Sequence, residues 1–245
     1  MINKTSLKGA IALLFISLIT SFAQAAVVEH NASITSDETW SALDTHYLGD
    51  YVFVENNATL TIEAGTTIYA YEKQGLQAPT LIVSRGAKII ANGTKEKPII
   101  FTSVLAKDSN LTKSEKGKWG GLVLLGNAPI NSNGSNANDL PLTNQIEGVP
   151  TTFINGGSIT TAKFTYGGSD STDNSGSLKY VSIRHGGAAL QLGKEINGLT
   201  LGGVGTGTTI ENIEVFANMD DGIEFFGGTV NAKYLTVAYV GDDGL

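Results

Sequence analysis

The chain has 245 residues and a formal net charge of −7, with 16 basic and 23 acidic side chains and no cysteine. An acidic chain without a basic patch lacks the phosphate-neutralising residues on which nucleic-acid binding depends, so nucleic acid is excluded as a partner. The lack of cysteine excludes disulfides, thiolate catalysis and cysteine-ligated zinc. The 30 glycines are about 12% of the chain, against a usual level of about 7%, and they indicate many tight turns between short strands.

The N-terminus has the pattern of an export signal that covers residues 1–25. Lys4 and Lys8 supply its positive start, residues 10–22 form an uncharged apolar run, and residues 23–25 read Ala-Gln-Ala, a small-x-small cleavage site. The apolar run is shorter than the roughly 20 residues that cross a bilayer. We therefore expect cleavage after residue 25, export to the periplasm, the cell surface or the medium, and no membrane span in the mature chain.

Short stretches of alternating apolar and polar residues follow the predicted signal. Residues 60–68 and 81–89 each show an apolar alternation, a glycine turn and a second alternation, 21 residues apart. Such alternation is typical of half-buried strands. The polar stretch 107–118 is predicted to be a loop thrown out from the repeating structure. We expect residues 26–50 to form an N-terminal lead-in or cap, and residues 51–245 to form one elongated domain.

The clearest repeat lies near the C-terminus. Residues 213–223 and 235–245 share their apolar positions and the tripeptide Asp-Asp-Gly, and the two stretches are 22 residues apart throughout. A repeat of this size, with short strands and glycine turns, matches one coil of a parallel β-helix. Stacked coils lie about 4.8 Å apart and bury one continuous core. We therefore predict an all-β fold, a single-stranded parallel β-helix in which like residues form columns.

The final coil of such a fold needs a cap, because its open edge would otherwise pair with other chains. The sequence ends at Leu245, directly after an Asp-Asp-Gly tripeptide, with no capping segment behind it. We therefore expect the β-helix in this sequence to be truncated at its C-terminus.

Several segments carry a resemblance to a known family. They are residues 118–130, 146–148, 178–187, 195–201 and, most clearly, 218–228. Together they resemble a largely uncharacterised group of secreted bacterial proteins with the pectate-lyase-like right-handed parallel β-helix. The resemblance covers nearly all of the mature chain, and it implies a right-handed fold and export rather than an activity.

A second resemblance is confined to one segment. Residues 218–221, Asn-Met-Asp-Asp, are similar to the Asn-x-Asp-Asp segment of polygalacturonase-type glycoside hydrolases, in which the paired acids serve an inverting reaction. This resemblance implies Asp220 and Asp221 as candidate catalytic residues. Gly222 departs from the pattern, because those enzymes often have cysteine there. Their further Gly-His-Gly and Arg-x-Lys motifs would lie beyond Leu245.

The 22-residue repeat brings four carboxylates together, because Asp220 should stack near Asp242, and Asp221 near Asp243. Mutual repulsion raises the pKa of some of these groups unless something neutralises them. Three interpretations stay open. The four side chains bind calcium, which prefers oxygen ligands; or Asp220 and Asp221 act as the acid and base of glycoside hydrolysis; or aspartate before glycine only shapes a turn that the chain uses twice.

The leading functional hypothesis is a secreted or cell-surface β-helix that binds or scaffolds, in contact with polysaccharide or another surface component. No complete catalytic set is visible, which favours a protein that is not an enzyme. The alternative is a polysaccharide-degrading enzyme, a glycoside hydrolase or polysaccharide lyase, that uses Asp220 and Asp221. Calcium is the one cofactor that the pattern suggests. Residues 202–207 are rich in glycine but lack the Lys-Ser/Thr ending and the helix of a phosphate-binding loop, so nucleotide is excluded as a ligand.

Overall fold

A computed structural model describes the chain except for residues 1–23, 132–141, 153–155 and 192–193. The predicted export signal lies almost wholly outside the described residues and stays a prediction. Regular structure in the described part is β-strand, apart from three short 3-10 helices. In that same part of the chain, no helix is long and apolar enough to cross a membrane.

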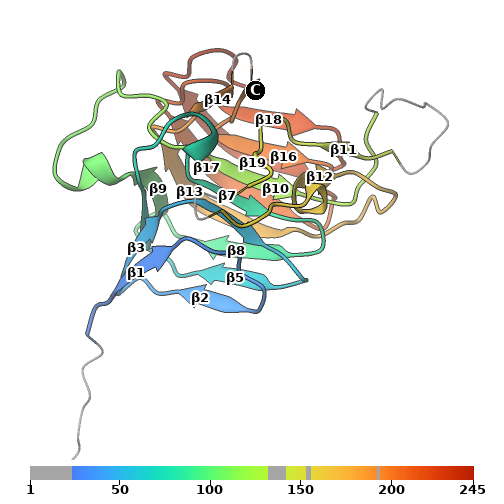
Figure 1. Cartoon of the computed structure of the whole chain (residues 1–245), viewed down its shortest axis with the longest axis horizontal. Coiled ribbons are helices and arrows are strands. Elements are labelled where there is room, and N and C mark those ends of the chain that lie inside the picture. The colour runs from blue at the N-terminus through green and yellow to red at the C-terminus, as the bar shows by residue number, and fades with distance from the viewer. Residues whose placement is uncertain (1–23, 132–141, 153–155, 192–193) are drawn as a thin grey trace, which may run out of the picture.

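The strands form three parallel ladders that the chain visits in a fixed order, so that it winds as a right-handed parallel β-helix (Figure 1). Ladder I contains β2 (Glu38–Trp40), β5 (Thr59–Ile62), β8 (Lys88–Asn92) and the first halves of β13 (Gly176–Arg184), β17 (Thr209–Phe216) and β19 (Asn231–Ala238). Ladder II contains β1 (Val27–His30), β3 (Thr45–Leu48), β6 (Thr67–Ala70), β9 (Ile99–Ser103) and the second halves of the same three strands. Ladder III contains β4 (Tyr51–Val54), β7 (Thr80–Val83), β10 (Leu122–Leu125), β16 (Leu199–Gly202) and β18 (Ile223–Phe226). The predicted all-β fold is confirmed.

The long strands β13, β17 and β19 turn the corner between ladders I and II, and their pairing skips one residue at the corner. Tyr180, Asn212 and Tyr234 occupy the corner in three successive coils, with φ values of 47°, 57° and 59°. This left-handed conformation rotates the next residue onto a new face, and it costs a side-chain-bearing residue free energy. The strained conformation recurs at the same position of each coil, because it allows the strand pairs of ladder I and of ladder II to form on either side of the corner.

The register confirms one predicted repeat and corrects the other. Ile213 pairs with Leu235, 22 residues further on, as predicted. Leu60 does not stack on Leu81; it pairs with Ile89 in ladder I, while Leu81 belongs to ladder III. The 21-residue prediction is wrong because strands of different ladders in one coil show the same apolar alternation.

The interior of the β-helix is a stack of apolar columns. One column of ladder III consists of inward residues that are fully buried, namely Val52, Leu81, Leu122, Leu199 and Ile223. Trp119 is also fully buried and lies parallel to Phe101, with 6.4 Å between the ring centroids. Stacking coils therefore bury one continuous core, which is the main source of stability in a chain without disulfides.

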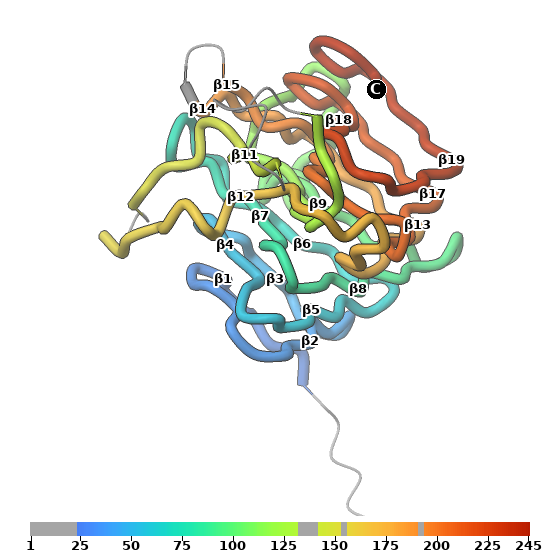
Figure 2. Tube along the Cα trace, turned by 90° about the vertical axis from the view of Figure 1, so that its right-hand side faces the viewer, coloured from blue at the N-terminus to red at the C-terminus, as the bar shows by residue number. Residues whose placement is uncertain are grey.

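A second apolar core lies on the outer face of ladder III. The segment that follows β10 folds back over this face (Figure 2). It carries the antiparallel pair β11 (Asn144–Gln145) and β12 (Thr165–Tyr166) and the 3-10 helix η3 (Thr161–Phe164). A second pair, β14 (Ala189–Gln191) with β15 (Lys194–Glu195), and the helix η1 (Gly75–Gln77) lie near it. The outer column below this cover changes along the β-helix from apolar to polar, in the order Phe53, Ile82, Val123, Thr200 and Glu224.

Candidate functional site

The Asp-Asp-Gly tripeptides lie in the turns that lead out of ladder II, and the two turns stack as the repeat predicted. The backbone N–H of Gly241 donates to the carbonyl of Asp220 at 3.2 Å, and the N–H of Gly222 donates to the carbonyl of Asp243 at 2.9 Å. Consecutive coils therefore continue their hydrogen-bonding pattern through the turns, and the side chains of Asp220 and Asp242 come from adjacent rungs.

The glycine of the motif has a structural reason. A Cβ on Gly222 would lie 2.4 Å from Cγ1 of Val237 and 2.7 Å from the carbonyl oxygen of Gly244. One coil earlier, a Cβ on Gly198 would lie 2.4 Å from Cγ1 of Val215. Each turn thus passes so close to the next coil that only glycine fits, and the interpretation of the tripeptide as a shared turn accounts for its third residue.

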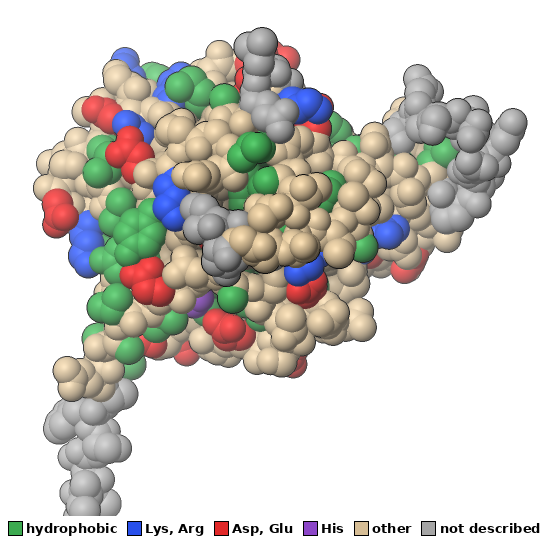
Figure 3. All heavy atoms as spheres, in the orientation of Figure 1, with side chains coloured by type: hydrophobic (Ala, Val, Ile, Leu, Met, Phe, Trp, Pro, Cys, Tyr) green, Lys and Arg blue, Asp and Glu red, His purple; other side chains and the backbone are tan. Residues whose placement is uncertain are grey.

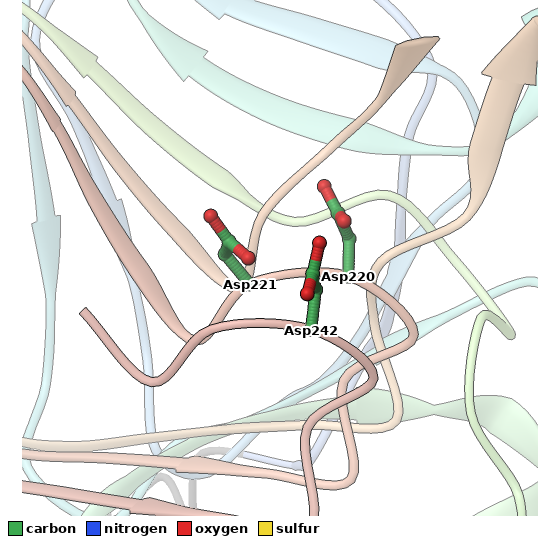
Figure 4. Close-up of side chains that lie close together, drawn as sticks. All are labelled: Asp220, Asp221 and Asp242. Atoms are coloured by element: carbon green, nitrogen blue, oxygen red, sulfur yellow. The ribbon is translucent and has the colours of Figure 1, made fainter. Parts of the chain in front are cut away.

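Three of the four predicted carboxylates gather in one group. Oxygen atoms of Asp220, Asp221 and Asp242 all lie within 4.8 Å of one another, and the side chains point to the same side of their turns (Figure 4). Asp243 is not a member of this group; its backbone N–H instead donates to Oδ1 of Asp221 at 2.8 Å. The predicted set of four is therefore reduced to three by the geometry.

The spacing of these oxygens suits one divalent cation. Calcium binds oxygen at about 2.3–2.6 Å, so two oxygens on one ion lie at most about 5 Å apart. An inverting glycosidase instead holds its two carboxyl groups about 6.5–9.5 Å apart, with room for a water molecule. The group of Asp220, Asp221 and Asp242 is tighter than that, since its oxygens lie within 4.8 Å.

Crowding perturbs the acid–base properties of the group. Burial, followed by the charges of Asp221, Glu195 and Asp242, raises the pKa of Asp220 to about 6. Burial, followed by the nearby charges of Asp221 and Asp220, also raises the pKa of Glu224, while a hydrogen bond from Asn197 opposes the rise. Ionising the whole group is therefore costly until a cation or a hydrogen-bond donor enters.

The group lies on the wall of a cleft of about 640 Å³. Six acidic side chains line it, and they are Glu147, Glu195, Asp220, Asp221, Glu224 and Asp242. Three aromatic rings and four side-chain amides also line it, from Tyr166, Phe225, Phe226, Asn131, Asn144, Gln145 and Asn197. Among the described lining residues there is no lysine or arginine. The cleft therefore combines strong hydrogen-bond acceptors with apolar ring faces.

The floor of the cleft is the polar end of the outer column of ladder III. Asn197 donates from Nδ2 to Oε2 of Glu224 at 2.5 Å and to Oγ1 of Thr200 at 3.4 Å. Its own Oδ1 is buried without a hydrogen-bond partner in the described structure. The amide thus holds Glu224 in place over β16 and β18, at the point where the apolar cover of the ladder ends.

Sequence reasoning found Asp220, Asp221 and Asp242 but missed Asn197, Glu147 and Glu195, which also line the cleft. A signal for them was present, because the segments 146–148, 195–201 and 218–228, which carry the family resemblance, all supply residues to this cleft. Nothing in the spacing of these segments says that they meet. Their meeting depends on how the insertions fold back on ladder III.

Comparison with known proteins agrees with the fold. A family model described as pectate-lyase like beta helix domain matches residues 32–245. No curated protein and no solved structure matches the chain. The matched range includes every described element except β1 and every residue of the acidic cleft, so the cleft belongs to the matched domain.

Proposed function

Because the chain belongs to the family of pectate-lyase-like β-helix domains, we propose that it is a glycan-binding module whose binding site is the acidic cleft. The observation that carries the proposal is the lining of the cleft, in which six carboxylates, four side-chain amides and three aromatic rings face one space of about 640 Å³. Ligand sites are concave, with apolar walls and a few convergent polar groups.

Each type of lining group has a counterpart on a sugar. Ionised carboxylates accept hydrogen bonds only, and sugar hydroxyls are donors; side-chain amides both donate and accept. The ring of Phe225, which lines the cleft and is 40% exposed, offers an apolar face to the C–H surface of a pyranose ring. The acidic lining repels anionic polymers, so the ligand that suits the cleft is a neutral glycan.

We further propose that one calcium ion binds Asp220, Asp221 and Asp242 at the wall of the cleft. The oxygens lie within 4.8 Å of one another. Burial, and then the charges of neighbouring carboxylates, raises the pKa of Asp220, and a bound cation would favour its ionised form. A bound cation would also let the cleft accept a glycan oxygen as a further ligand. The ion and the glycan would then bind cooperatively.

The test measures glycan binding and thermal unfolding with calcium and with chelator. We expect binding of at least one neutral oligosaccharide on a glycan array, and a melting temperature that rises with calcium, since a ligand of the native state stabilises it by mass action. Asp220→Asn with Asp221→Asn should abolish the calcium effect. Asp243→Asn is the matched control, because Asp243 belongs to the same repeat but not to the carboxylate group.

Two results would count against the proposal separately. If the melting temperature does not change with calcium or with chelator, the proposed calcium ion is excluded and the proposed glycan site is unaffected. If no glycan on the array binds at any calcium concentration, the proposed glycan site is excluded.

A second candidate function is polysaccharide degradation, as a glycoside hydrolase or polysaccharide lyase. The observation that favours it is the pKa of Asp220, raised to about 6, which suits a group that must donate a proton near neutral pH. The double change of Asp220 and Asp221 to asparagine is again the test. Unchanged cleavage of every polysaccharide that the protein degrades would remove these residues as catalysts.

Both candidate functions presuppose export, which we propose from residues 1–25 alone. Expression of the whole chain in a bacterial host, followed by fractionation and intact-mass measurement, tests it. The expected product lies outside the cytoplasm and has lost 25 residues; an uncleaved cytoplasmic product would contradict the proposal.

A further inference from the structure

A second concave site lies on a different face of the molecule, against the outside of ladder II. The segment 104–118, which begins with η2 (Val104–Lys107), arches over this face and encloses a groove of about 300 Å³. The groove is lined by Thr67, Tyr69, Ile100, Thr102, Ala106, Ser109, Asn110, Leu111, Arg184 and His185. None of these residues lines the acidic cleft.

The arching segment is fastened at both ends, so the groove is a built space. Lys107 donates from Nζ to the hydroxyl of Tyr47. Near the other end, Lys116 donates from Nζ to the carbonyl of Val240 at 3.0 Å. Figure 3 shows hydrophobic side chains gathered beside basic and acidic ones on the side of the molecule where β3 lies.

Arg184 is the one cation among the lining residues. Its Nε donates to Oγ of Ser182 at 2.6 Å and its Nη2 donates to Oε2 of Glu214 at 2.9 Å. These contacts fix one edge of the guanidinium, and within the described residues Nη1 makes no hydrogen bond. A planar guanidinium held in this way is oriented to bind an anionic oxygen with its remaining N–H groups.

Thr102 adds a polar group without a partner. Its side chain is 5% exposed, and Oγ1 is buried with no hydrogen bond in the described structure. A buried hydroxyl without a hydrogen-bond partner destabilises the folded chain while it stays unsatisfied. A ligand hydroxyl in the groove would satisfy it.

His185 supplies an acceptor. Its Nδ1 lies 2.6 Å from the carbonyl oxygen of Glu115, which can only accept, so Nδ1 carries the hydrogen. Burial lowers the pKa of the imidazole, which keeps the ring neutral at pH 7 and leaves Nε2 with a lone pair. The groove is thus lined by a cationic donor, a hydroxyl and a neutral acceptor, together with the apolar residues Ile100 and Leu111.

We propose that this groove is a second ligand site, which takes a monosaccharide-sized ligand with one anionic group. Arg184 binds the anionic group, Thr102 and His185 bind ring hydroxyls, and Tyr69 and Leu111 contact the apolar ring face. No acidic side chain lines the groove, and Arg184, although it pairs with Glu214, keeps Nη1 as a donor, so the groove suits an anionic ligand that the acidic cleft would repel. The inference does not depend on the function proposed for that cleft.

The experiment measures binding of glucuronate, glucose 6-sulfate, glucose 6-phosphate and glucose to the purified protein by saturation-transfer NMR and calorimetry. We expect at least one charged sugar to bind about tenfold or more tightly than glucose, the size of one charge-assisted hydrogen bond. Which charged sugar binds best identifies the anionic group. Sodium sulfate and sodium phosphate serve as probes for the anion alone.

Matched variants separate the roles of the residues. Arg184→Gln should remove the preference for charged sugars. Lys179→Gln is its control, because Lys179 lies on the same strand, has a similarly exposed side chain (42% against 41%) and also pairs with a glutamate. Thr102→Val conserves the volume of a buried side chain and should weaken binding of charged and neutral sugars alike.

Three results would overturn the proposal. They are no binding of any charged sugar, equal binding by the Arg184→Gln and Lys179→Gln variants, and inorganic anions that bind as tightly as the sugars. If Arg184→Gln does not fold, Thr102→Val decides, since unchanged affinity in that variant excludes the groove as the site. Asp220→Asn with Asp221→Asn should leave this binding unchanged, which separates it from binding in the acidic cleft.

Discussion

The first coil of the β-helix contains a buried histidine pair whose titration should limit stability in acid. His30 is 6% exposed and stacks on Trp40, with 3.9 Å between the ring centroids. Its Nε2 lies 3.0 Å from Nδ1 of His46, whose Nε2 lies 2.9 Å from the carbonyl oxygen of Ser41. The carbonyl can only accept, so His46 carries its hydrogen on Nε2 and accepts from His30 at Nδ1. His30 therefore carries a hydrogen on Nε2, and its Nδ1, which lies 3.8 Å from Oε1 of Glu38, is the atom that takes up a proton in acid.

The pKa of His30 sets the size and direction of the effect. Burial, followed by the charge of His46, lowers it from 6.5 to about 4. The unfolded chain takes up a proton at about pH 6.5, whereas the folded chain resists protonation until about pH 4. Stability from this group is therefore complete above pH 6.5 and is lost as the pH falls toward 4. The difference of about 2.5 pKa units corresponds to about 3 kcal/mol.

The assay compares the wild-type protein with His30→Gln by urea unfolding at pH 7 and pH 4. Glutamine keeps an N–H donor for His46 but does not titrate in this range. We expect the wild type to lose about 3 kcal/mol relative to the variant between the two pH values, because other titrating groups are common to both proteins. A difference between the two proteins that is the same at pH 7 and pH 4 would refute the assignment of His30 as a buried neutral base.

Three further changes have expected outcomes. Gly222→Ala should cost about 1–3 kcal/mol in urea unfolding, because its Cβ would lie 2.4 Å from Cγ1 of Val237. Trp119→Phe should cost about 1–3 kcal/mol in the same assay, since it removes the indole N–H that donates to the carbonyl of Arg184 at 2.8 Å. The pKa of Asp220 is raised from 3.8 to about 6, so its contribution to stability is present below pH 3.8 and is lost as the pH rises through 6. In chelator, Asp220→Asn should therefore raise the melting temperature at pH 7 more than at pH 4; an equal effect at both pH values would contradict this.

The spacing of residues along the sequence predicted only part of the acidic cleft. Asp220 and Asp242 were placed together correctly, because they come from consecutive coils of equal length. Asp243 stacks next to Asp221 as predicted, since its backbone N–H donates to Oδ1 of Asp221, but its carboxylate is not part of the group whose oxygens lie within 4.8 Å of one another. Asn197 and Glu147 reach the cleft only because β16 pairs with β18 and because the segment after β10 folds back over ladder III, and neither is visible in the spacing of residues.

The sequence by itself determined the β-helix and the columns of its last coils. Ile213 and Leu235 stack because the chain between them makes one turn without an insertion, so equal spacing along the sequence becomes contact in space. Only the tertiary structure decided the ladder to which Leu81 belongs and the walls of both concave sites. Insertions of unequal length separate the other coils, and each insertion finds its place through apolar and hydrogen-bonding contacts with the outside of the ladders, for which the coil spacing carries no information.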